Sequence, residues 1–337
     1  MFEVLDSEAD DTNIPEIKID KPADYAYYPG CVDFYDMEMQ FSVENYGETN
    51  HGIIIDSTIK LLRAVGIDPL VLERTYMKCC GHDQLWQGKT EAFLKMRDYN
   101  TKIIKQLGVK TIVVSCGEGY RTFLKDYNLE GIEVRHITQV LIERGFKLPE
   151  TTEGEVRVTY QDPCRMCRQM GGQAVYDEPR ELLQNAPGVE YVEMEHFRES
   201  LHCCGVAGMM YCNPKTKGLT FRRMGEAKEV EADYLLTACP KCLTHFGCLN
   251  HEDLFRKEGD KFAFKVQDVT QFLAERLPRE ASEEWPEPPL PREPGKPAAQ
   301  RKVVATASKL APPTPAPGPA VQAPTTKKEL PTEAATS

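Results

Sequence analysis

Apolar and polar positions follow two spacings along the chain, and these predict its secondary structure. Segments of strand length that are rich in apolar and β-branched residues occur at residues 111–115, 156–160 and 234–238. Helical spacing of apolar positions instead predicts amphipathic helices near residues 57–65 and 91–107. Because strands and helices alternate, we expect an α/β fold with parallel sheets and right-handed crossovers.

The sequence repeats itself. Residues 136–144 read His-Ile-Thr-Gln-Val-Leu-Ile-Glu-Arg, and residues 268–276 read Asp-Val-Thr-Gln-Phe-Leu-Ala-Glu-Arg. The apolar runs at 111–115 and 234–238 are both followed directly by a cysteine. A repeat of this kind predicts two tandem, pseudo-repeated α/β domains, at residues 25–150 and 151–278. Cysteines that follow strands are expected in loops at the strand ends, where α/β folds build their sites.

Two flanking segments differ from this repeat. Residues 1–24 form an acidic N-terminal arm without the basic start and apolar stretch of a signal peptide. Residues 279–337 are rich in Pro, Ala, Glu and Thr, and predict a disordered or partner-docking tail, because so few large apolar side chains cannot offset the entropy of ordering.

Composition excludes two classes of function. The net charge is −11 and no basic stripe is present, so nucleic-acid binding is not expected. The mean hydropathy is −0.46, and no apolar run approaches about 20 residues, so direct membrane insertion is not expected. Twelve cysteines without an export signal predict a cytoplasmic location, where cysteines bind metals or act in catalysis rather than form disulfides.

The cysteines form two similar sets. Each set contains a Cys-Cys-Gly doublet with one cysteine upstream and one downstream. The first set is Cys31, Cys79, Cys80 and Cys116, and the second is Cys164, Cys203, Cys204, Cys239 and Cys242. Cys167 could be an alternative ligand or a thiol beside the site, whereas Cys212 and Cys248 are expected to be packed core thiols.

Converging thiolates are typical of iron–sulfur centres, because soft, anionic sulfur suits iron. Zinc is the alternative, but a structural zinc site takes four tetrahedral ligands, typically from two separated pairs. The second set offers five thiols, two of them adjacent, which suits a core of several metal ions. The spacing therefore favours iron–sulfur clusters over zinc.

The two halves resemble the paired cysteine-rich CCG domains of the heterodisulfide reductase catalytic-subunit family (B-like and D-like). Tyr28-Pro29-Gly30-Cys31, Asp162-Pro163-Cys164 and residues 203–210 carry the resemblance, which covers about residues 25–278. In that family each complete set of five cysteines holds a noncubane iron–sulfur cluster, and a disulfide is cleaved between two facing clusters. The resemblance therefore implies two clusters here, the second of the noncubane 4Fe-4S type.

The first half departs from the family pattern at one position. Cys31, Cys79, Cys80 and Cys116 match, but Gly119 stands where a fifth cysteine is expected. Four cysteines can support a cubane cluster, a noncubane core with one open iron, or a degraded site. The type of the first cluster therefore stays open.

The resemblance implies an iron–sulfur subunit of a cytoplasmic multi-subunit oxidoreductase that moves electrons between a partner and a thiol–disulfide couple. The sequence has neither a Gly-x-Gly-x-x-Gly fingerprint nor a ferredoxin-type cysteine run, so a ferredoxin-like subunit and a flavin-containing subunit are expected as partners. His82, His202 and His245 are candidate proton donors to a departing thiolate, because imidazole titrates near neutral pH.

Two other functions are open. One is pure electron transfer for another reductase or dehydrogenase, of the benzoyl-CoA reductase or lactate/glycolate type, without disulfide cleavage. The other is a metal-stabilised assembly module without redox turnover.

Overall fold

The structure is a computed structural model that describes residues 23–32, 51–72, 77–151, 154–206, 213–251 and 262–278. Nearly all of the predicted acidic arm, the whole predicted tail and Cys212 lie outside the described residues. Within the described ranges, no helix combines the length and apolar character needed to cross a membrane.

The first half forms a four-stranded parallel sheet in the order β2-β1-β3-β4. Its strands are β1 (Tyr25–Tyr28), β2 (Leu70–Val71), β3 (Thr111–Val114) and β4 (Glu133–His136). The register pairs Tyr28 with Val114, and Val114 with His136. Since the strands are parallel, their carboxyl ends share one edge of the sheet, and Cys31 and Cys116 follow strands at that edge.

The second half forms a second four-stranded parallel sheet, in the order β6-β5-β7-β8. Its strands are β5 (Val156–Gln161), β6 (Val189–Tyr191), β7 (Tyr234–Thr237) and β8 (Lys265–Asp268). This order is that of the first sheet, with β5 in the place of β1 and β7 in the place of β3. The predicted α/β fold with two pseudo-repeated parallel sheets is therefore confirmed.

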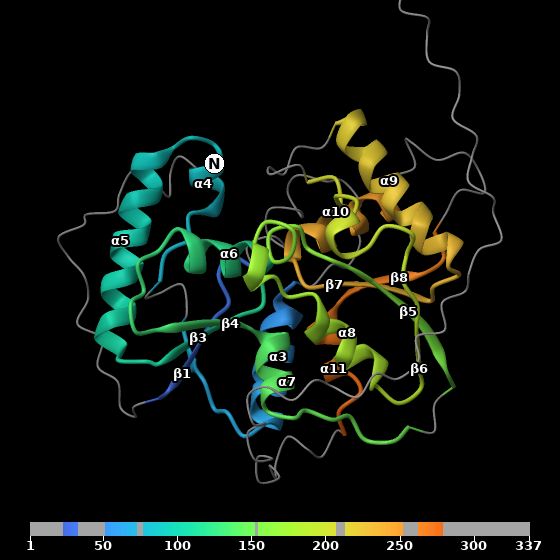
Figure 1. Cartoon of the computed structure of the whole chain (residues 1–337), viewed down its shortest axis with the longest axis horizontal. Helices are drawn as coiled ribbons and strands as arrows, with labels where there is room; N and C mark the ends of the chain where they lie inside the picture. The colour runs from blue at the N-terminus through green and yellow to red at the C-terminus, as the bar shows by residue number, and fades with distance from the viewer. Residues whose placement is uncertain are drawn as a thin grey trace, which may run out of the picture. The chain divides into compact units, whose positions relative to one another are not determined.

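Helices connect the strands in both halves (Figure 1). The helices of the first half are α3 (Gly52–Ala64), α4 (His82–Trp86), α5 (Thr90–Leu107), α6 (Gly117–Lys125) and α7 (Ile137–Glu143). Those of the second are α8 (Asp177–Gln184), α9 (Pro214–Glu229), α10 (Pro240–His251) and α11 (Val269–Ala274), with 3-10 turns η1 (Gly171–Gln173) and η2 (Arg198–Ser200). Helix α3 begins one turn or more before the predicted start near residue 57.

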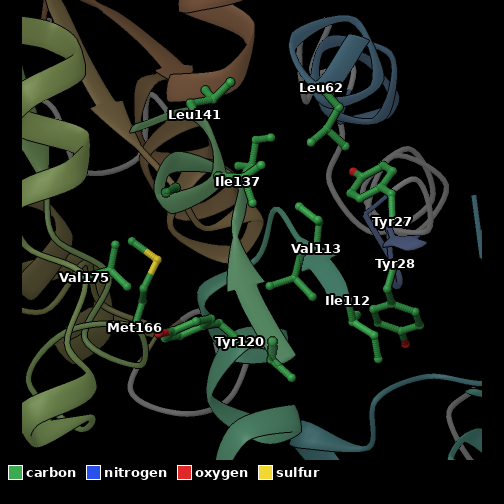
Figure 2. Close-up of a cluster of buried hydrophobic side chains, with 14 of the residues drawn as sticks. Tyr27, Tyr28, Leu62, Ile112, Val113, Tyr120, Ile137, Leu141, Met166 and Val175 are labelled. Carbon is green, nitrogen blue, oxygen red and sulfur yellow. The ribbon is translucent and has the colours of Figure 1, made fainter. Parts of the chain in front are cut away.

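The two halves pack through equivalent helices. Helix α3 packs against α11, and α7 packs against α8. In the repeat, α3 corresponds to α8 and α7 to α11, so the two contacts are related by an approximate two-fold axis. The buried apolar core is continuous across this contact, since one cluster contains Tyr27 and Ile137 of the first half and Met166 and Val175 of the second (Figure 2).

The repeated Thr-Gln segment begins the last helix of each half. The side chain of His136 accepts a hydrogen bond from the Thr138 N–H at the start of α7. The Asp268 carboxylate accepts one from the Thr270 N–H, at 2.8 Å, at the start of α11. The repeat is thus explained by helix capping, which satisfies otherwise unpaired N–H groups.

Burial shifts the pKa values of these two capping side chains in opposite directions. Burial raises the pKa of Asp268 to about 7 and lowers the pKa of His136 to about 3. Between about pH 4 and 7 the Asp268 carboxyl is ionised in the unfolded chain but stays protonated in the folded chain. The folded state therefore loses stability relative to the unfolded state as pH rises through this range. For His136 the sign is reversed: its contribution is present above about pH 6.5 and is lost as pH falls toward 3.

We expect Asp268→Asn to keep the helix cap and to remove the loss of stability between about pH 4 and 7, which amounts to up to about 4 kcal/mol. The measurement is anaerobic urea unfolding over this pH range. Asp98→Asn, at an exposed carboxylate on α5, is the matched control and should leave the slope unchanged. An Asp268→Asn variant with the wild-type slope would contradict the assignment.

Candidate metal centre

The first cysteine set surrounds a pocket at the carboxyl edge of the first sheet. Cys31 follows β1, Cys116 follows β3, and the doublet Cys79-Cys80 stands just before α4. All four line one pocket together with Tyr28. Cys79 accepts a hydrogen bond from the thiol of Cys31 and donates one to Cys80. The chain thus gathers these four predicted residues around one space.

The second set forms a continuous network of thiols. The Sγ of Cys242 lies 3.1 Å from the Sγ of Cys204. Cys164 and Cys204 are both hydrogen-bond neighbours of Cys203, and Cys242 is a neighbour of Cys239 as well as of Cys204. Elements far apart in sequence supply these groups: the ends of β5 and β7, the doublet and the first turn of α10.

The two sets meet at the approximate two-fold axis. Cys116 and Cys239, which hold equivalent places after β3 and β7, are hydrogen-bonded to each other. Glu118 and Lys241 are also equivalent, and Lys241 Nζ lies 2.8 Å from Glu118 Oε2. Lys241 forms a second ion pair with Asp83. A buried cation and its two carboxylates thus lie beside the point where the cysteine sets touch.

The glycine of each doublet is required by the backbone. Gly81 has φ +80° and Gly205 has φ +104°, in the left-handed region that side chains rarely adopt. A Cβ at Gly81 would lie 2.7 Å from Phe93 Cδ2, and one at Gly205 would lie 2.2 Å from Thr220 Oγ1. Both positions therefore exclude any side chain, for reasons of conformation and of space.

Backbone N–H groups point at the sulfur atoms in both halves. The donor–acceptor pairs are Gly81 with Cys79, Gly205 with Cys203, Gly119 with Cys116, and Cys242 with Cys239. The N···S distance at the doublet is 3.5 Å in the first half and 3.4 Å in the second. Such N–H groups stabilise anionic sulfur and tune the potential of iron–sulfur clusters.

The thiols constrain one another's ionisation. Hydrogen bonds to neighbouring cysteines, and then burial, raise the pKa of Cys116, Cys164, Cys204 and Cys242. The pKa of Cys239 is lowered, first because it accepts a hydrogen bond from Cys116. These raised pKa values disfavour several thiolates at once, so a full set of thiolates needs compensating positive charge. Bound metal supplies such charge, so this donor set fits a metal core with sulfur ligands.

Gly119 is structurally equivalent to Cys242. Gly119 is the third residue of α6, and Cys242 is the third residue of α10. A Cβ at Gly119 would meet the Cβ of Cys116 at 3.8 Å, which is an ordinary contact. Space therefore exists for a fifth side chain, and the difference between the two sites is chemical rather than steric.

Two other cysteines in the described chain lie in the core. Cys167 is fully buried, and its thiol donates to the Val175 carbonyl at 3.2 Å. Burial raises its pKa. Cys248 is buried in α10. The environment of Cys167 is that of a packed core thiol.

The three candidate proton donors lie in different surroundings. His82 is buried, with Nδ1 3.1 Å from Thr122 Oγ1 and Nε2 3.4 Å from Glu118 Oε1. Burial, followed by the charge of Lys241, lowers its pKa to about 2. Burial also lowers the pKa of His245 to about 4. Both imidazoles are therefore neutral at pH 7.

His202 is more exposed and does not share this environment. Its Nδ1 lies 2.5 Å from Glu226 Oε1, and its side chain is 26% exposed. The sequence reasoning missed Glu226, and it also missed Glu118, Lys241 and Asp83. A signal existed for one pair, because residues 118 and 241 hold equivalent places in the repeat and carry opposite charges.

Comparison with known proteins identifies the repeated unit. The cysteine-rich domain CCG matches residues 25–123 and again residues 158–247. The D polypeptide of the dihydromethanophenazine:CoB–CoM heterodisulfide reductase of Methanosarcina barkeri is 26% identical over 78% of this chain and 61% of its own length.

Two bacterial proteins are also similar. The "Probable iron-sulfur-binding oxidoreductase FadF" of Bacillus subtilis is 30% identical over 80% of this chain and 37% of its own length. The EtfAB:quinone oxidoreductase of Syntrophomonas wolfei is 28% identical over 75% of this chain and 34% of its own length. The chain thus spans between about a third and three fifths of the length of these relatives. It belongs to the family of cysteine-rich CCG domain proteins, carries two such domains, and is homologous to the D polypeptide of heterodisulfide reductase.

Proposed function

We propose that this chain is an iron–sulfur subunit of a multi-subunit oxidoreductase that moves electrons between a partner subunit and a thiol–disulfide couple. One observation carries the proposal: two sets of cysteines meet at Cys116 and Cys239, on the approximate two-fold axis. Metal centres held by sets in such contact would exchange electrons over a short path. The oxidoreductases among the homologues support the same class of function.

The proposed ligands are the nine cysteines of the two sets. They are Cys31, Cys79, Cys80 and Cys116 for the first cluster, and Cys164, Cys203, Cys204, Cys239 and Cys242 for the second. Clusters bound there would supply one-electron transfer. The second set has the five thiols of a noncubane 4Fe-4S site, whereas the first, with four, would hold a cubane cluster or a noncubane core with an open iron.

The chain's own residues have defined roles in this proposal. The thiolates hold the metal, and the backbone N–H groups of Gly81 and Gly205 stabilise the first sulfur of each doublet. The buried Lys241 ammonium compensates part of the negative charge between the two sets. The N–H groups and the ammonium would favour the reduced, more negative state of a bound cluster, whereas the anionic thiolates oppose it.

The pocket of the first set would receive the substrate sulfur. Gly119 lines this pocket next to Cys116, and Asp83 and Pro240 line it from neighbouring helices. Because residue 119 offers no thiol, this side of the pocket is open to a sulfur from a thiol or a disulfide. A neutral, buried His82 lies in the same wall and can donate a hydrogen bond there.

Partners would complete the electron path. We propose a ferredoxin-like iron–sulfur subunit and a flavin-containing subunit, since the similar heterodisulfide reductase polypeptide is by its name one subunit of a larger complex. Electron-transfer partners of this kind often associate through modest surfaces. Copurification of iron–sulfur or flavin proteins with the tagged chain would support this part of the proposal.

A second candidate is pure electron transfer without disulfide cleavage. Two observations favour it: Gly119 removes one thiol from the first set, and the similar FadF and EtfAB:quinone oxidoreductase are named for other electron-transfer reactions. In that case the first cluster would be a cubane that only relays electrons.

Thiol titration separates the two candidates. If a thiol–disulfide couple is the substrate, adding a thiol to the anaerobic, oxidised protein should produce a new paramagnetic signal, because the thiol sulfur binds at the open side of the first pocket. The measurement is electron paramagnetic resonance at increasing thiol concentration, with the corresponding alcohol as the control. A chain that accepts electrons from dithionite but shows no thiol-dependent signal would favour pure electron transfer.

A further inference from the structure

Two histidines and a glutamate gather beside the second cysteine set but outside it. His196 lies in the segment after β6, His202 directly precedes the doublet, and Glu226 lies in α9. Nδ1 of His196 is 3.2 Å, and Nδ1 of His202 is 2.5 Å, from the same atom, Glu226 Oε1. One potential ligand atom from each of the three residues lies within 4.8 Å of the other two.

The spacing of these atoms matches a metal site. In tetrahedral zinc coordination, with metal–ligand bonds near 2.1 Å, neighbouring ligand atoms lie roughly 3.4 Å apart. The His196–Glu226 distance of 3.2 Å already has this value, and the His202–Glu226 pair needs only a small outward movement. The two imidazole rings are stacked with their centroids 3.8 Å apart and 24° between their planes, and Nδ1 of each lies near the same carboxylate oxygen. Because ring lone pairs lie in the ring planes, one imidazole must turn about its side-chain bonds for both nitrogens to bind one ion.

One of these nitrogens lacks a satisfying partner. Nδ1 of His196 is buried and makes no well-aligned hydrogen bond to any described residue, although it faces a carboxylate oxygen. A buried polar atom without a partner is costly, and a ring lone pair that faces a carboxylate is repelled. A cation between the three atoms would remove both penalties.

Hydrogen bonds to its second oxygen, Oε2, fix the orientation of the Glu226 carboxylate. Glu226 Oε2 accepts hydrogen bonds from Arg223 Nη1, at 2.5 Å, and from the backbone N–H of His196, at 3.2 Å. Arg223 is fully buried and also bonds to Gln161, whose amide donates to the His202 carbonyl at 3.2 Å. This network orients Oε1 toward the histidines, in the way that outer hydrogen bonds orient metal ligands.

The site is open enough to exchange an ion. The side chains of His196 and His202 are 29% and 26% exposed, whereas that of Glu226 is 6% exposed. Glu195 Oε2 lies 4.0 Å from His196 Nδ1 on a side chain that is 73% exposed. Glu195 or a water molecule can therefore supply a fourth ligand.

We propose that His196, His202 and Glu226 bind one divalent transition-metal ion of the zinc type, separate from the iron–sulfur centres. Two imidazoles and a carboxylate are a ligand set that such ions accept. The ion would tie the loop after β6 and the residue before Cys203 to helix α9. It would thereby fix the peptide that carries the second doublet.

The test uses the full-length chain with its iron centres intact. The anaerobic, iron-loaded protein is equilibrated with zinc against a weak chelator, and zinc and iron are then counted. We expect one zinc ion per chain, no loss of iron, and only nitrogen and oxygen neighbours in zinc X-ray absorption. His196→Gln and Glu226→Gln should each weaken zinc binding at least about tenfold. Glu229→Gln, at an exposed position on the same helix, is the matched control and should bind zinc normally.

Three results would overturn the proposal. Zinc with sulfur neighbours, or zinc bound only as iron is lost, would place the ion at the cysteines. If His196→Gln binds zinc as tightly as the unaltered chain, His196 is not a ligand of the zinc ion. If protein with its full iron content binds no stoichiometric zinc, then His196, His202 and Glu226 form an ordinary hydrogen-bonded group and not a metal site. His196→Gln changes a part-exposed side chain, so its folding can be checked independently by its iron content.

Discussion

Replacement of Gly205 by alanine is expected to destabilise the chain by about 3 kcal/mol or more, because it combines two penalties. The residue adopts φ +104°, where a Cβ costs roughly 1–3 kcal/mol. The new Cβ would also lie 2.2 Å from Thr220 Oγ1 and 2.6 Å from the Thr216 carbonyl oxygen, so helix α9 or the doublet must move. The measurement is the free energy of unfolding under anaerobic conditions, together with the iron content.

Gly218→Ala is the matched control for this substitution. Gly218 lies in α9, close in sequence to the two threonines, and a Cβ there meets no atom within 4 Å. Alanine should stabilise this helix by about 0.5–1 kcal/mol. If both substitutions changed stability equally, the steric account of the Cys-Cys-Gly motif would be wrong.

Gly119→Cys is expected to change the first metal centre and leave the second unaltered. The position is equivalent to Cys242, and its new Cβ would make only an ordinary contact with Cys116. A fifth thiol would then be available on the open side of the first pocket, so the Mössbauer and paramagnetic spectra of that centre should change. The thiol-dependent signal of the unaltered protein should be lost, because the added cysteine occupies the place of the external sulfur.

Gly119→Ser distinguishes the effect of a thiol ligand at residue 119 from the effect of added side-chain volume. Serine has nearly the same size but offers no soft sulfur, so the spectra should stay close to those of the unaltered protein. Identical spectra for the unaltered protein and Gly119→Cys would mean that residue 119 does not face the first centre, and that the four-cysteine assignment is wrong.

Strands β3, β5 and β7 could be predicted because their apolar signals are local. The apolar run before Cys116 forms β3, and the run before Cys239 forms β7. The repeated Thr-Gln segment marks equivalent helices, and the structure adds the physical reason, since His136 and Asp268 cap them. Strands β1, β4, β6 and β8 have only three or four residues each, and β2 has only Leu70 and Val71, so none of the five gives a clear periodic signal or is among the predicted segments.

The meeting of the two cysteine sets could not be predicted, because it depends on packing between the halves. Sequence spacing assigns Cys116 to the first set and Cys239 to the second, and gives no sign that their thiols touch. Lys241 is likewise adjacent to Cys242 in sequence, yet its ammonium pairs with Glu118 and Asp83 of the first half. Such contacts arise only once α3 and α7 pack on α11 and α8.

The histidine site illustrates a different limit. His202 is a predicted proton donor because it adjoins the doublet, but its partners His196 and Glu226 come from a loop and from the next helix. No short motif joins the three residues. The division of the core at residue 150 stays a prediction, since each half has its own sheet while one buried cluster contains residues of both.

Iron and acid-labile sulfide counts on the anaerobically prepared chain decide whether the two cysteine sets hold iron–sulfur clusters. We expect about eight iron atoms per chain, with sulfide present, if both sites hold four-iron clusters. Cys204→Ser should lose about half of this iron, whereas Cys167→Ser, at the core thiol that bonds to the Val175 carbonyl, should lose none. A folded chain that carries zinc on sulfur ligands, with neither iron nor sulfide, would contradict the account.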